Sequence, residues 1–324
     1  MKATLIYNTS AGKANALTPD DLLAALQNVG FSPVYLATND ENDLDEILKD
    51  VDGLVVSAGG DGTAKAVATR LIGNPHAAIT ILPMGTANNL VATLGVEGSP
   101  LEIIERLRHP AKHRFDLGYV TAPWGEDYFM EGAGLGFFAE VLARYEPEKG
   151  KSITRSVKTL VEVLAQGYGQ KTTLHLPQQD ITGEFLLVEI LNAHAVGPRL
   201  KFAPDADPTD GLLHVVCIDG ERRESFFTYL RGLLTEEIVA LPSVSESRVS
   251  ELWIEWYGFP FHIDDYVQPK GFDFRQTNPE ETAHLLHMFP DVPEAAMIHV
   301  RVLPQALEIW LPECLEGKEY PHAN

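Results

Sequence analysis

Short apolar runs alternate with helical stretches over the first third of the chain. The pattern predicts strands at 3–7, 33–36, 53–57 and 78–82. Two of the helical stretches begin with a hydroxyl residue and a proline, Thr18-Pro19 and Ser99-Pro100. A Ser or Thr cap followed by proline is typical of a helix start. The alternation therefore predicts an α/β domain, a doubly wound parallel sheet, over residues 1–115.

From about residue 116 the pattern becomes richer in strands. Apolar runs predict strands at 185–190, 212–218, 252–256 and 297–302. Helices are expected near 135–145, 152–168 and 221–234. We interpret residues 116–304 as a β-rich second domain. The C-terminal tail, about 305–324, is expected to pack back on the first domain.

Composition agrees with a two-domain protein that has no membrane span. The 324 residues are 45% hydrophobic, which is enough for two sizeable cores. No apolar run approaches the roughly 18 to 20 residues that a membrane helix needs. Cys217 and Cys314 are too few for a disulfide framework. We expect a cytoplasmic protein, and a peripheral position at the inner membrane face stays open.

The charge balance limits the classes of binding partner that the chain would attract. With 25 basic and 46 acidic residues, the formal net charge is −21, which opposes nucleic acid and, on average, anionic membranes. We therefore expect no nucleic-acid partner. The basic cluster Lys149, Lys151, Arg155 and Lys158 would allow a transient contact with a membrane surface. A solvated helix face explains the same cluster.

The loop Gly59-Gly60-Asp61-Gly62-Thr63 carries the clearest chemistry. It directly follows the apolar run 54–58. Glycines at a strand-to-helix turn let backbone N–H groups approach a phosphate, because no Cβ blocks the way. Asp61 would repel that phosphate unless a metal ion lies between them or the carboxylate bonds a hydroxyl. The loop predicts a nucleotide held with Mg²⁺; the alternative is a glycine-rich turn that only packs closely.

A second loop of small residues follows the next predicted strand. The run 78–82 leads into Pro83-Met84-Gly85-Thr86-Ala87-Asn88-Asn89-Leu90. The carboxyl ends of parallel strands meet at one edge of a sheet, so we expect both loops to face one crevice there. Thr86 would offer a hydroxyl to a phosphate.

These two loops, in this order, resemble the diacylglycerol kinase catalytic family, specifically its bacterial lipid kinase branch, which is related to sphingosine kinases. The segment 8–13 stands where family members open with Asn-Pro-x-x-Gly. The resemblance continues through the second half of the chain, at segments 116–119, 132–137, 191–193, 203–213 and 298–307. NAD kinases and phosphofructokinases carry similar glycine loops, so the ordered set is more specific than the loop alone.

The resemblance implies a fold, cofactors and binding residues. The fold would be an N-terminal α/β domain of the NAD kinase and diacylglycerol kinase type with a C-terminal β-sandwich-like domain. The cofactors would be ATP and Mg²⁺, and the substrate a lipid or amphiphile; a homodimer stays open. The implied nucleotide-binding residues are Asn8, Thr38, Gly59, Gly60, Asp61, Gly62, Thr63, Gly85 and Thr86. The implied metal ligands are Asp207, Asp210 and the carbonyl of Leu212, although Asp210 would also suit a plain turn.

The catalytic base is the least certain part of the resemblance. Family members place Asp-Gly-Glu on a strand near the cleft, where this chain has Asp264, Asp265 and Tyr266. Asp264 and Asp265 are the candidate bases, with Asp61 as the third catalytic candidate, because adjacent carboxylates can raise one pKa. A solvated turn is the alternative. About 30 further residues, from 267 to 296, form an insert that the family pattern lacks.

Two more departures from the family pattern remove acidic side chains that family members have around the nucleotide. Family members continue the first loop with Leu-Asn-Glu, where this chain has Ala64-Lys65-Ala66, and Asn89 replaces an acid in the second loop. Three functions stay open. They are a lipid kinase, a nucleotide-binding protein of the same fold with weak or lost catalysis, and a kinase of a soluble substrate such as NAD.

Overall fold

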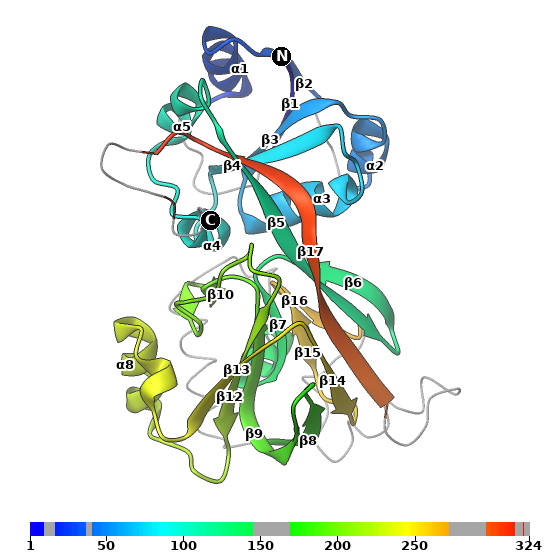
Figure 1. Ribbon diagram of the computed structural model, residues 1–324, viewed down its shortest axis with the longest axis vertical. Coiled ribbons are helices and arrows are strands. Elements are labelled where there is room, and N and C mark those ends of the chain that lie inside the picture. Colours follow the sequence, from blue (N-terminus) through cyan, green and yellow to red (C-terminus); the bar gives the residue numbers. More distant parts are fainter. Residues whose placement is uncertain (10–16, 37–40, 145–168, 272–295, 315–319, 321–324) are drawn as a thin grey trace. The chain divides into compact units, whose positions relative to one another are not determined.

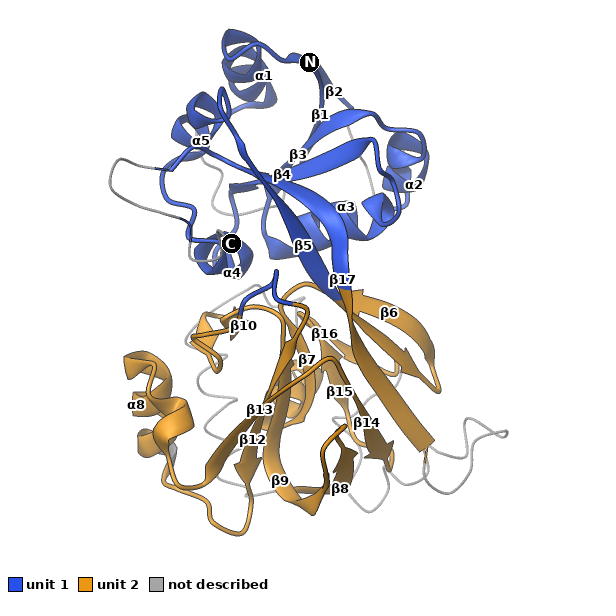
Figure 2. Ribbon diagram, viewed as in Figure 1, with its two compact units in different colours: residues 1–117, 207–210, 304–324 blue, residues 118–206, 211–303 orange. Residues whose placement is uncertain are grey.

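The computed structural model describes residues 1–9, 17–36, 41–144, 169–271, 296–314 and 320 (Figure 1). Two compact units make up the chain (Figure 2). The first contains residues 1–117, 207–210 and 304–324, and the second contains residues 118–206 and 211–303. The short segment 207–210, which the sequence pattern assigns to the second domain, belongs to the first unit.

A parallel sheet forms the centre of the first unit. Its strands are β1 (Lys2–Tyr7), β2 (Ser32–Tyr35), β3 (Gly53–Gly59) and β4 (Ala77–Pro83), in the order β4-β3-β1-β2. The strand β17 (Ala296–Leu311) joins β4 in parallel, with Ile309 opposite Ile79. Nearly every residue of β3 and β4 is buried, as expected for a parallel sheet covered on both faces.

The helices of this unit follow the strands. They are α1 (Pro19–Asn28), α2 (Asp43–Leu48), α3 (Asp61–Leu71), α4 (Asn89–Thr93) and α5 (Pro100–Arg106). Thr18 and Ser99 both form capping boxes, which confirms the predicted helix starts. Leu22 of α1 and Ile103 of α5 pack with Leu54 and Val56 of β3. Because successive side chains point to opposite faces of a strand, Val55 points to the face of the sheet opposite Leu54 and Val56. The helix α3 contacts β3 and β4.

Antiparallel strands build most of the second unit. They include the end of β5 (Ala111–Ala122), which begins in the first unit. The others are β6 (Gly125–Phe129), β7 (Gly132–Gly136), β8 (Gln170–His175), β9 (Asp180–Leu191), β12 (Leu213–Asp219), β13 (Val244–Val249), β14 (Glu251–Trp256), β15 (Phe261–Ile263) and β16 (Tyr266–Gln268). Their inward residues surround Trp256, which is fully buried. The hairpin of β10 (Ala195–Val196) and β11 (Leu200–Lys201) forms a separate small sheet.

The described helices of this unit are short. Residues 137–144 form α6 (Phe137–Arg144), because β7 continues to Gly136 before the helix begins. The helix α8 (Phe226–Thr235) and the 3-10 turn η2 (Ile238–Ala240) lie near the predicted range 221–234. The predicted helix 152–168, the basic cluster 149–158 and most of the insert 267–296 lie outside the described residues.

A buried carboxylate joins three separate segments of the first unit. Asp116 on β5 is fully buried, and one of its carboxylate oxygens accepts the N–H of Gln305, 2.6 Å away. The N–H of Asp116 donates to the carbonyl of Pro208, 2.7 Å away. Asp116 therefore connects β5 with the 207–210 segment and with the start of the C-terminal segment.

Candidate functional site

The two glycine loops meet backbone to backbone in the first unit. Gly59 ends β3, and its carbonyl accepts the N–H of Met84, 2.9 Å away. A Cβ added to Gly85 would lie 2.6 Å from the Cα of Gly60, which no real side chain tolerates. Only glycine fits this approach, so the loops expose peptide groups where any other residue would carry a side chain.

The first loop is held by two polar side chains. The Asn8 amide nitrogen, just after β1, donates to the Thr63 hydroxyl, 2.9 Å away. A Cβ on Gly59 would overlap that same hydroxyl. Asn8, Gly59 and Thr63 therefore depend on one another, and the sequence analysis nominated all three.

Asp61 connects the two loops through a hydrogen bond. It opens α3, and its Oδ1 accepts the N–H of Leu90 in α4, 3.2 Å away. The second loop has its own brace, because the side chain of Asn88 both accepts the N–H of Gly85 and donates to its carbonyl, at 2.9 and 3.0 Å. Asn88 adopts a left-handed φ of 51°, a conformation that asparagine tolerates well. Gly62 and Thr86 are exposed.

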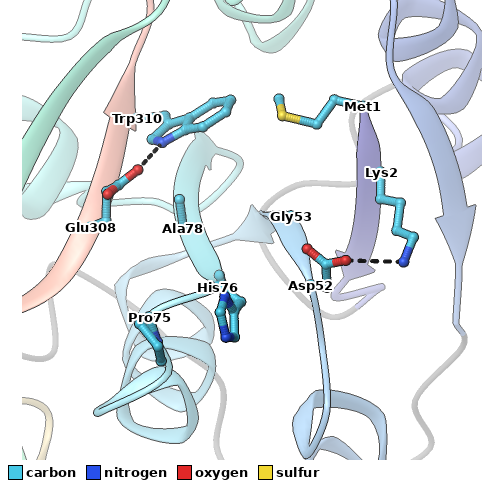
Figure 3. A pocket seen from close by; sticks show the side chains of 10 residues that line it. Met1, Lys2, Asp52, Gly53, Pro75, His76, Ala78, Glu308 and Trp310 are labelled. Atoms are coloured by element: carbon cyan, nitrogen blue, oxygen red, sulfur yellow. Dashed lines mark hydrogen bonds and ion pairs between the residues drawn. The ribbon is translucent and has the colours of Figure 1, made fainter.

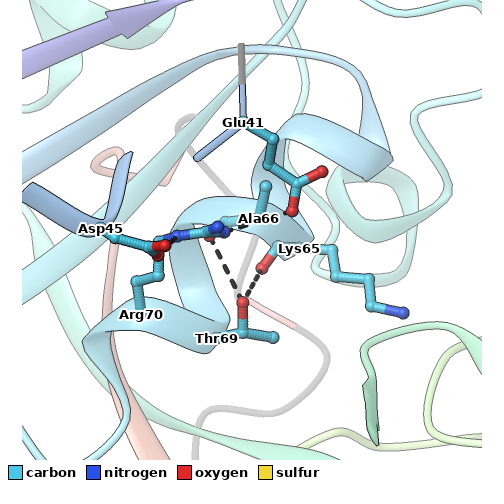
Figure 4. Close-up of polar contacts among 6 residues, drawn as sticks. All are labelled: Glu41, Asp45, Lys65, Ala66, Thr69 and Arg70. Atoms are coloured by element: carbon cyan, nitrogen blue, oxygen red, sulfur yellow. Dashed lines mark hydrogen bonds and ion pairs between the residues drawn. The ribbon is translucent and has the colours of Figure 1, made fainter. Parts of the chain in front are cut away.

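The side of α3 that carries the family departures has its own ion pairs (Figure 4). Arg70 places Nε 2.6 Å from an Asp45 carboxylate oxygen and Nη1 3.2 Å from a Glu41 oxygen. Nη1 also donates to the Ala66 carbonyl, 2.8 Å away. The Lys65 side chain extends away from this group in Figure 4. Asn89, the other departure, is buried at the start of α4.

A pocket of about 320 Å³ opens at the opposite edge of the same sheet (Figure 3). Its lining includes Lys2, Gly53 and Ala77, the first residues of β1, β3 and β4. Trp310 forms another wall, with its indole N–H donating to Glu308, 2.7 Å away. The glycine loops are at the carboxyl ends of these strands, so this pocket is not the predicted phosphate site.

The nominated metal ligands Asp207 and Asp210 lie in one turn, where the N–H of Asp210 donates to the Asp207 carbonyl, 3.4 Å away. Asp207 Oδ1 accepts the backbone N–H and the hydroxyl of Thr209, at 2.9 and 2.7 Å. Asp207 and Asp210 belong to the first unit and Leu212 to the second. Across the described parts of the chain, no group of three His, Cys, Asp or Glu residues could hold a metal ion. Thr38 lies outside the described residues.

In the second unit, Asp264 is bound to three backbone amides. Its buried carboxylate accepts the N–H groups of Met130, Glu131 and Gly132, at 3.3, 2.9 and 3.2 Å. The N–H of Asp264 donates to the Gly132 carbonyl, 2.8 Å away, and its φ is 51°. The neighbouring Asp265 is exposed. Asp264 thus fixes the turn after β15 to the start of β7.

Tyr266 is hydrogen-bonded to a carboxylate that the sequence analysis missed. Its phenol donates to Asp127 on β6, 139 residues earlier in the chain. Burial, followed by this hydrogen bond, raises the pKa of Tyr266 far above its ordinary value. Lys270 Nζ lies 4.8 Å from the centre of the Tyr266 ring. No local pattern marks Asp127, because the contact depends on the pairing of distant hairpins.

Behind this turn lies a buried His–Glu pair. His262, Gly134 and Glu189 stand opposite one another on β15, β7 and β9. Gly134, the middle residue, has no side chain, so the side chains of His262 and Glu189 can meet across it. The distance from His262 Nε2 to the Glu189 carboxylate is 2.9 Å, and both side chains are fully buried. His262 Nδ1 lies 3.2 Å from the Asp264 carbonyl. Each ring nitrogen of His262 therefore has a hydrogen-bond partner. His262 is therefore a hydrogen-bonded structural histidine.

Two known domains match most of the chain. Residues 2–120 match the diacylglycerol kinase catalytic domain. Residues 155–271 match the YegS C-terminal NAD kinase beta sandwich-like domain. The two matched ranges together cover most of the chain, so the resemblance to the diacylglycerol kinase catalytic domain family is confirmed.

Two similar proteins carry the same name. A protein named "Probable lipid kinase YegS-like" from Pseudomonas fluorescens is 30% identical over 167 residues, which are 50% of this chain and 52% of the relative. A protein of the same name from Stenotrophomonas maltophilia is 27% identical over 209 residues, 62% of this chain and 67% of the relative. The similarity thus spans about half to two thirds of the length of these relatives.

A solved structure supports the fold over a greater length. It is titled a "putative diacylglycerol kinase" from Bacillus anthracis and superimposes with a TM-score of 0.71. The sequences are 17% identical, and the match covers 96% of this chain and 95% of the other. The predicted fold, a parallel α/β domain with a β-sandwich-like domain, is therefore confirmed.

The structure groups the nominated residues differently in the two units. Asn8, Gly59, Gly60, Asp61, Thr63 and Gly85 gather at the meeting point of two loops. The turn Asp264–Tyr266 instead uses its side chains to bind other strands of the second unit. None of the described helices is long and apolar enough to cross a membrane.

Proposed function

We propose that this chain is an ATP- and Mg²⁺-dependent kinase that phosphorylates a hydroxyl group of a lipid, such as a diacylglycerol, a sphingoid base or a related amphiphile. The backbone approach of Gly60 and Gly85 carries this proposal, because it opens peptide groups to a phosphate beside the start of α3. The names of the relatives support a lipid as the acceptor.

The first unit suits a nucleotide phosphate. A Cβ at Gly59, Gly60 or Gly85 would fill or close the space between the loops. Gly60 caps α3 without a side-chain bond, and the N-terminus of a helix attracts anions. The loops would therefore hold the nucleotide by backbone N–H groups and position its terminal phosphate.

A magnesium ion would enter with the nucleotide. Mg²⁺ is commonly bound by one or two carboxylates together with substrate phosphates, so it does not need a cluster of protein ligands. Asp61, at the first turn of α3, is the carboxylate of the glycine loop. Bound there, the ion would neutralise charge that develops on the phosphates during transfer.

The acceptor side requires a lipid and a proton acceptor. A lipid acceptor implies transient contact with a membrane surface, and we propose a cytoplasmic location for the chain. Transfer from ATP forms a bond between the lipid oxygen and the γ-phosphorus, while the bond from that phosphorus to the leaving oxygen of ADP breaks. The hydroxyl proton passes to a base of the chain.

A second candidate is a nucleotide-binding protein of this fold with weak or lost catalysis. Asp264 favours it, because the carboxylate that the resemblance nominates as a base already accepts three backbone N–H groups. Tyr266 in place of a family glutamate favours it as well.

Transfer of a labelled phosphate separates the two candidates. The full chain is incubated with γ-labelled ATP, Mg²⁺ and phosphatidylcholine vesicles that carry diacylglycerol or sphingosine, and label is counted in the extracted lipid. We expect label in the lipid with the native chain and at least about 100-fold less with Asp61→Ala. Tight ATP binding by calorimetry without transfer to any lipid would contradict the kinase and favour the second candidate.

A further inference from the structure

The two most exposed large apolar side chains among the described residues belong to one helix. They are Phe227 and Leu234 of α8, and each is 77% exposed. Seven residues make almost two turns of an α-helix, so both side chains lie on the same face. The helix stands at the periphery of the second unit (Figure 1). Exposed apolar side chains that share a face mark a candidate interaction surface.

The opposite face of α8 is packed in the core of the second unit. Tyr229 and Leu233, one turn apart, are buried together with Ile238 of η2. The Tyr229 and Ser243 hydroxyl oxygens are 3.1 Å apart. Gly232 lets the helix approach closely, because a Cβ there would lie 3.1 Å from the Ile238 Cα. Apolar side chains therefore stand on two faces of α8, one buried in the core and the other exposed to solvent.

A positive charge lies on the exposed face. Arg231 is exposed there, between Phe227 and Leu234 in the sequence. It is the one charged residue of α8, in a chain that has 46 acidic residues. A guanidinium binds phosphate oxygens, and its apolar stem can lie along a lipid surface. The exposed face thus combines two apolar side chains with a group that suits a phospholipid headgroup.

The carboxylates near α8 lie beyond its two ends. After the helix, Glu236 pairs with Lys201, 2.5 Å away, and Glu237 accepts the Thr235 hydroxyl, 3.0 Å away. The turn before the helix has two acidic and two basic residues, which are Glu221, Arg222, Arg223 and Glu224. The ends add no net positive charge, so binding to lipid would depend mainly on apolar contact and would not require anionic lipid.

We propose that the exposed face of α8, formed by Phe227, Arg231 and Leu234, docks on the surface of a phospholipid bilayer. The choice of a bilayer rests on the proposed function, because a lipid acceptor is presented at such a surface. A helix with this pattern lies in the plane of the interface, with its apolar side chains at the acyl boundary and its cation among the headgroups. A second copy of the chain suits this face less well, since each copy has a formal net charge of −21.

Sedimentation of the full chain with phosphatidylcholine vesicles, without ATP, tests the docking. We expect the native chain to bind, and the double variant Phe227→Ser with Leu234→Ser to lower the partition coefficient at least about 20-fold. Arg231→Gln should lower it by only about threefold, because an exposed ionic contact contributes little. The matched control is Val34→Ser with Leu101→Ser, which removes two exposed aliphatic side chains of the first unit and should bind as the native chain does.

Label transfer to two acceptors separates docking from catalysis. Initial rates are measured with diacylglycerol in the vesicles and with dihexanoylglycerol dissolved in buffer. The double variant should lose at least about tenfold in rate toward the vesicles and keep the native rate toward the dissolved acceptor. Phe227→Trp should bind vesicles within about twofold of native, because tryptophan has an apolar body and a polar N–H that suit the interface. Circular dichroism checks that each variant is folded.

Vesicle binding by the double variant within threefold of native, or an equal loss in the control, would overturn the docking surface. A native dimer that the double variant dissociates, with vesicle binding unchanged, would assign this face to a second copy instead; light scattering measures it. A native chain that labels dihexanoylglycerol without sedimenting with vesicles would overturn the docking and leave the kinase. Vesicle binding through α8 without transfer to either acceptor would overturn the proposed function alone.

Discussion

The loops 59–63 and 84–89 of the first unit meet at glycines, which have no side chains, whereas the turn 264–266 of the second unit meets distant segments through its side chains. Gly60 and Gly85 approach each other through their backbones. Asp264 and Tyr266 instead bind the 130–132 segment and Asp127.

This difference bears on how each region tolerates change. Any side chain added where the two glycine loops meet would push their backbones apart, so each of these positions requires glycine. A turn held by side chains can exchange one polar group for another as long as a partner on a neighbouring strand accommodates it. Tyr266 with Asp127 is such an exchange in this chain, and we expect perturbations of the two regions to have different consequences.

The largest expected effect is on the stability of the turn. Asp264→Ala would leave three buried N–H groups without their acceptor and place alanine at a φ of 51°. We expect a loss of about 4 kcal/mol in the local opening free energy of the 130–132 amides. Hydrogen exchange of these amides measures it. Asp264→Asn keeps one acceptor and tolerates the φ, so its loss should be smaller; equal losses would contradict the hydrogen-bond account.

A slightly smaller effect is expected behind the turn. His262→Leu would leave the fully buried Glu189 without its partner, at a cost of about 3 kcal/mol. The double variant with Glu189→Leu removes both polar groups and should be more stable than either single variant. Chemical denaturation followed by tryptophan fluorescence compares the four proteins. Additive losses would show that the two side chains are not coupled.

The glycine loops should respond through binding rather than stability. Gly85→Ala would force the two loops apart, because its Cβ would lie 2.6 Å from the Cα of Gly60. We expect ATP affinity, measured by calorimetry, to fall by about 100-fold, or about 2.7 kcal/mol. Gly183→Ala is the matched control, since its Cβ would make an ordinary 3.5 Å contact with Phe185. Native affinity in Gly85→Ala would separate the glycine approach from nucleotide binding.

The smallest effect concerns a surface pair on β8 and β9 in the second unit. The Asp180 carboxylate, 2.9 Å from His175 Nδ1, holds the pKa of that imidazole above its ordinary value. A raised folded pKa means that the pair stabilises fully below the unfolded pKa, about 6.5, and that the gain disappears as pH rises through the folded pKa. Since the pair is partly exposed, we expect less than about 0.5 kcal/mol.

Thermal midpoints of the native chain and His175→Gln, taken at about pH 6 and about pH 8, measure this pair. The difference between the two proteins should shrink at the higher pH. A difference that grows with pH would have the wrong sign for a raised imidazole pKa.

Local pattern was sufficient for the parallel sheet and for the glycine loops. The runs at 3–7, 53–57 and 78–82 became β1, β3 and β4 within two residues at each end. Gly59 and Gly60 could be nominated because they come directly after the apolar run 54–58, and Gly85 because it follows the run 78–82 after Pro83 and Met84. The partner of the carboxylate in that loop is not visible in the local pattern, since Asp61 accepts the N–H of Leu90, 29 residues later.

The side-chain contacts of the second unit could not be predicted from the sequence, because they join residues far apart in the chain. Tyr266 and Asp127 are 139 residues apart, and Asp264 reaches amides more than 130 residues earlier. The space above Gly134 becomes visible only when β15, β7 and β9 are aligned. Strand register in an antiparallel sheet depends on the whole fold, and a single sequence does not reveal it.

The central claim is that a nucleotide phosphate binds where the two glycine loops meet. Amide hydrogen exchange of the whole chain, with and without ATP and Mg²⁺, tests it most directly. We predict slower exchange in residues 59–64 and 84–90 when ATP is added. Unchanged exchange there, with protection instead around the Trp310 pocket at the opposite edge of the sheet, would contradict the claim.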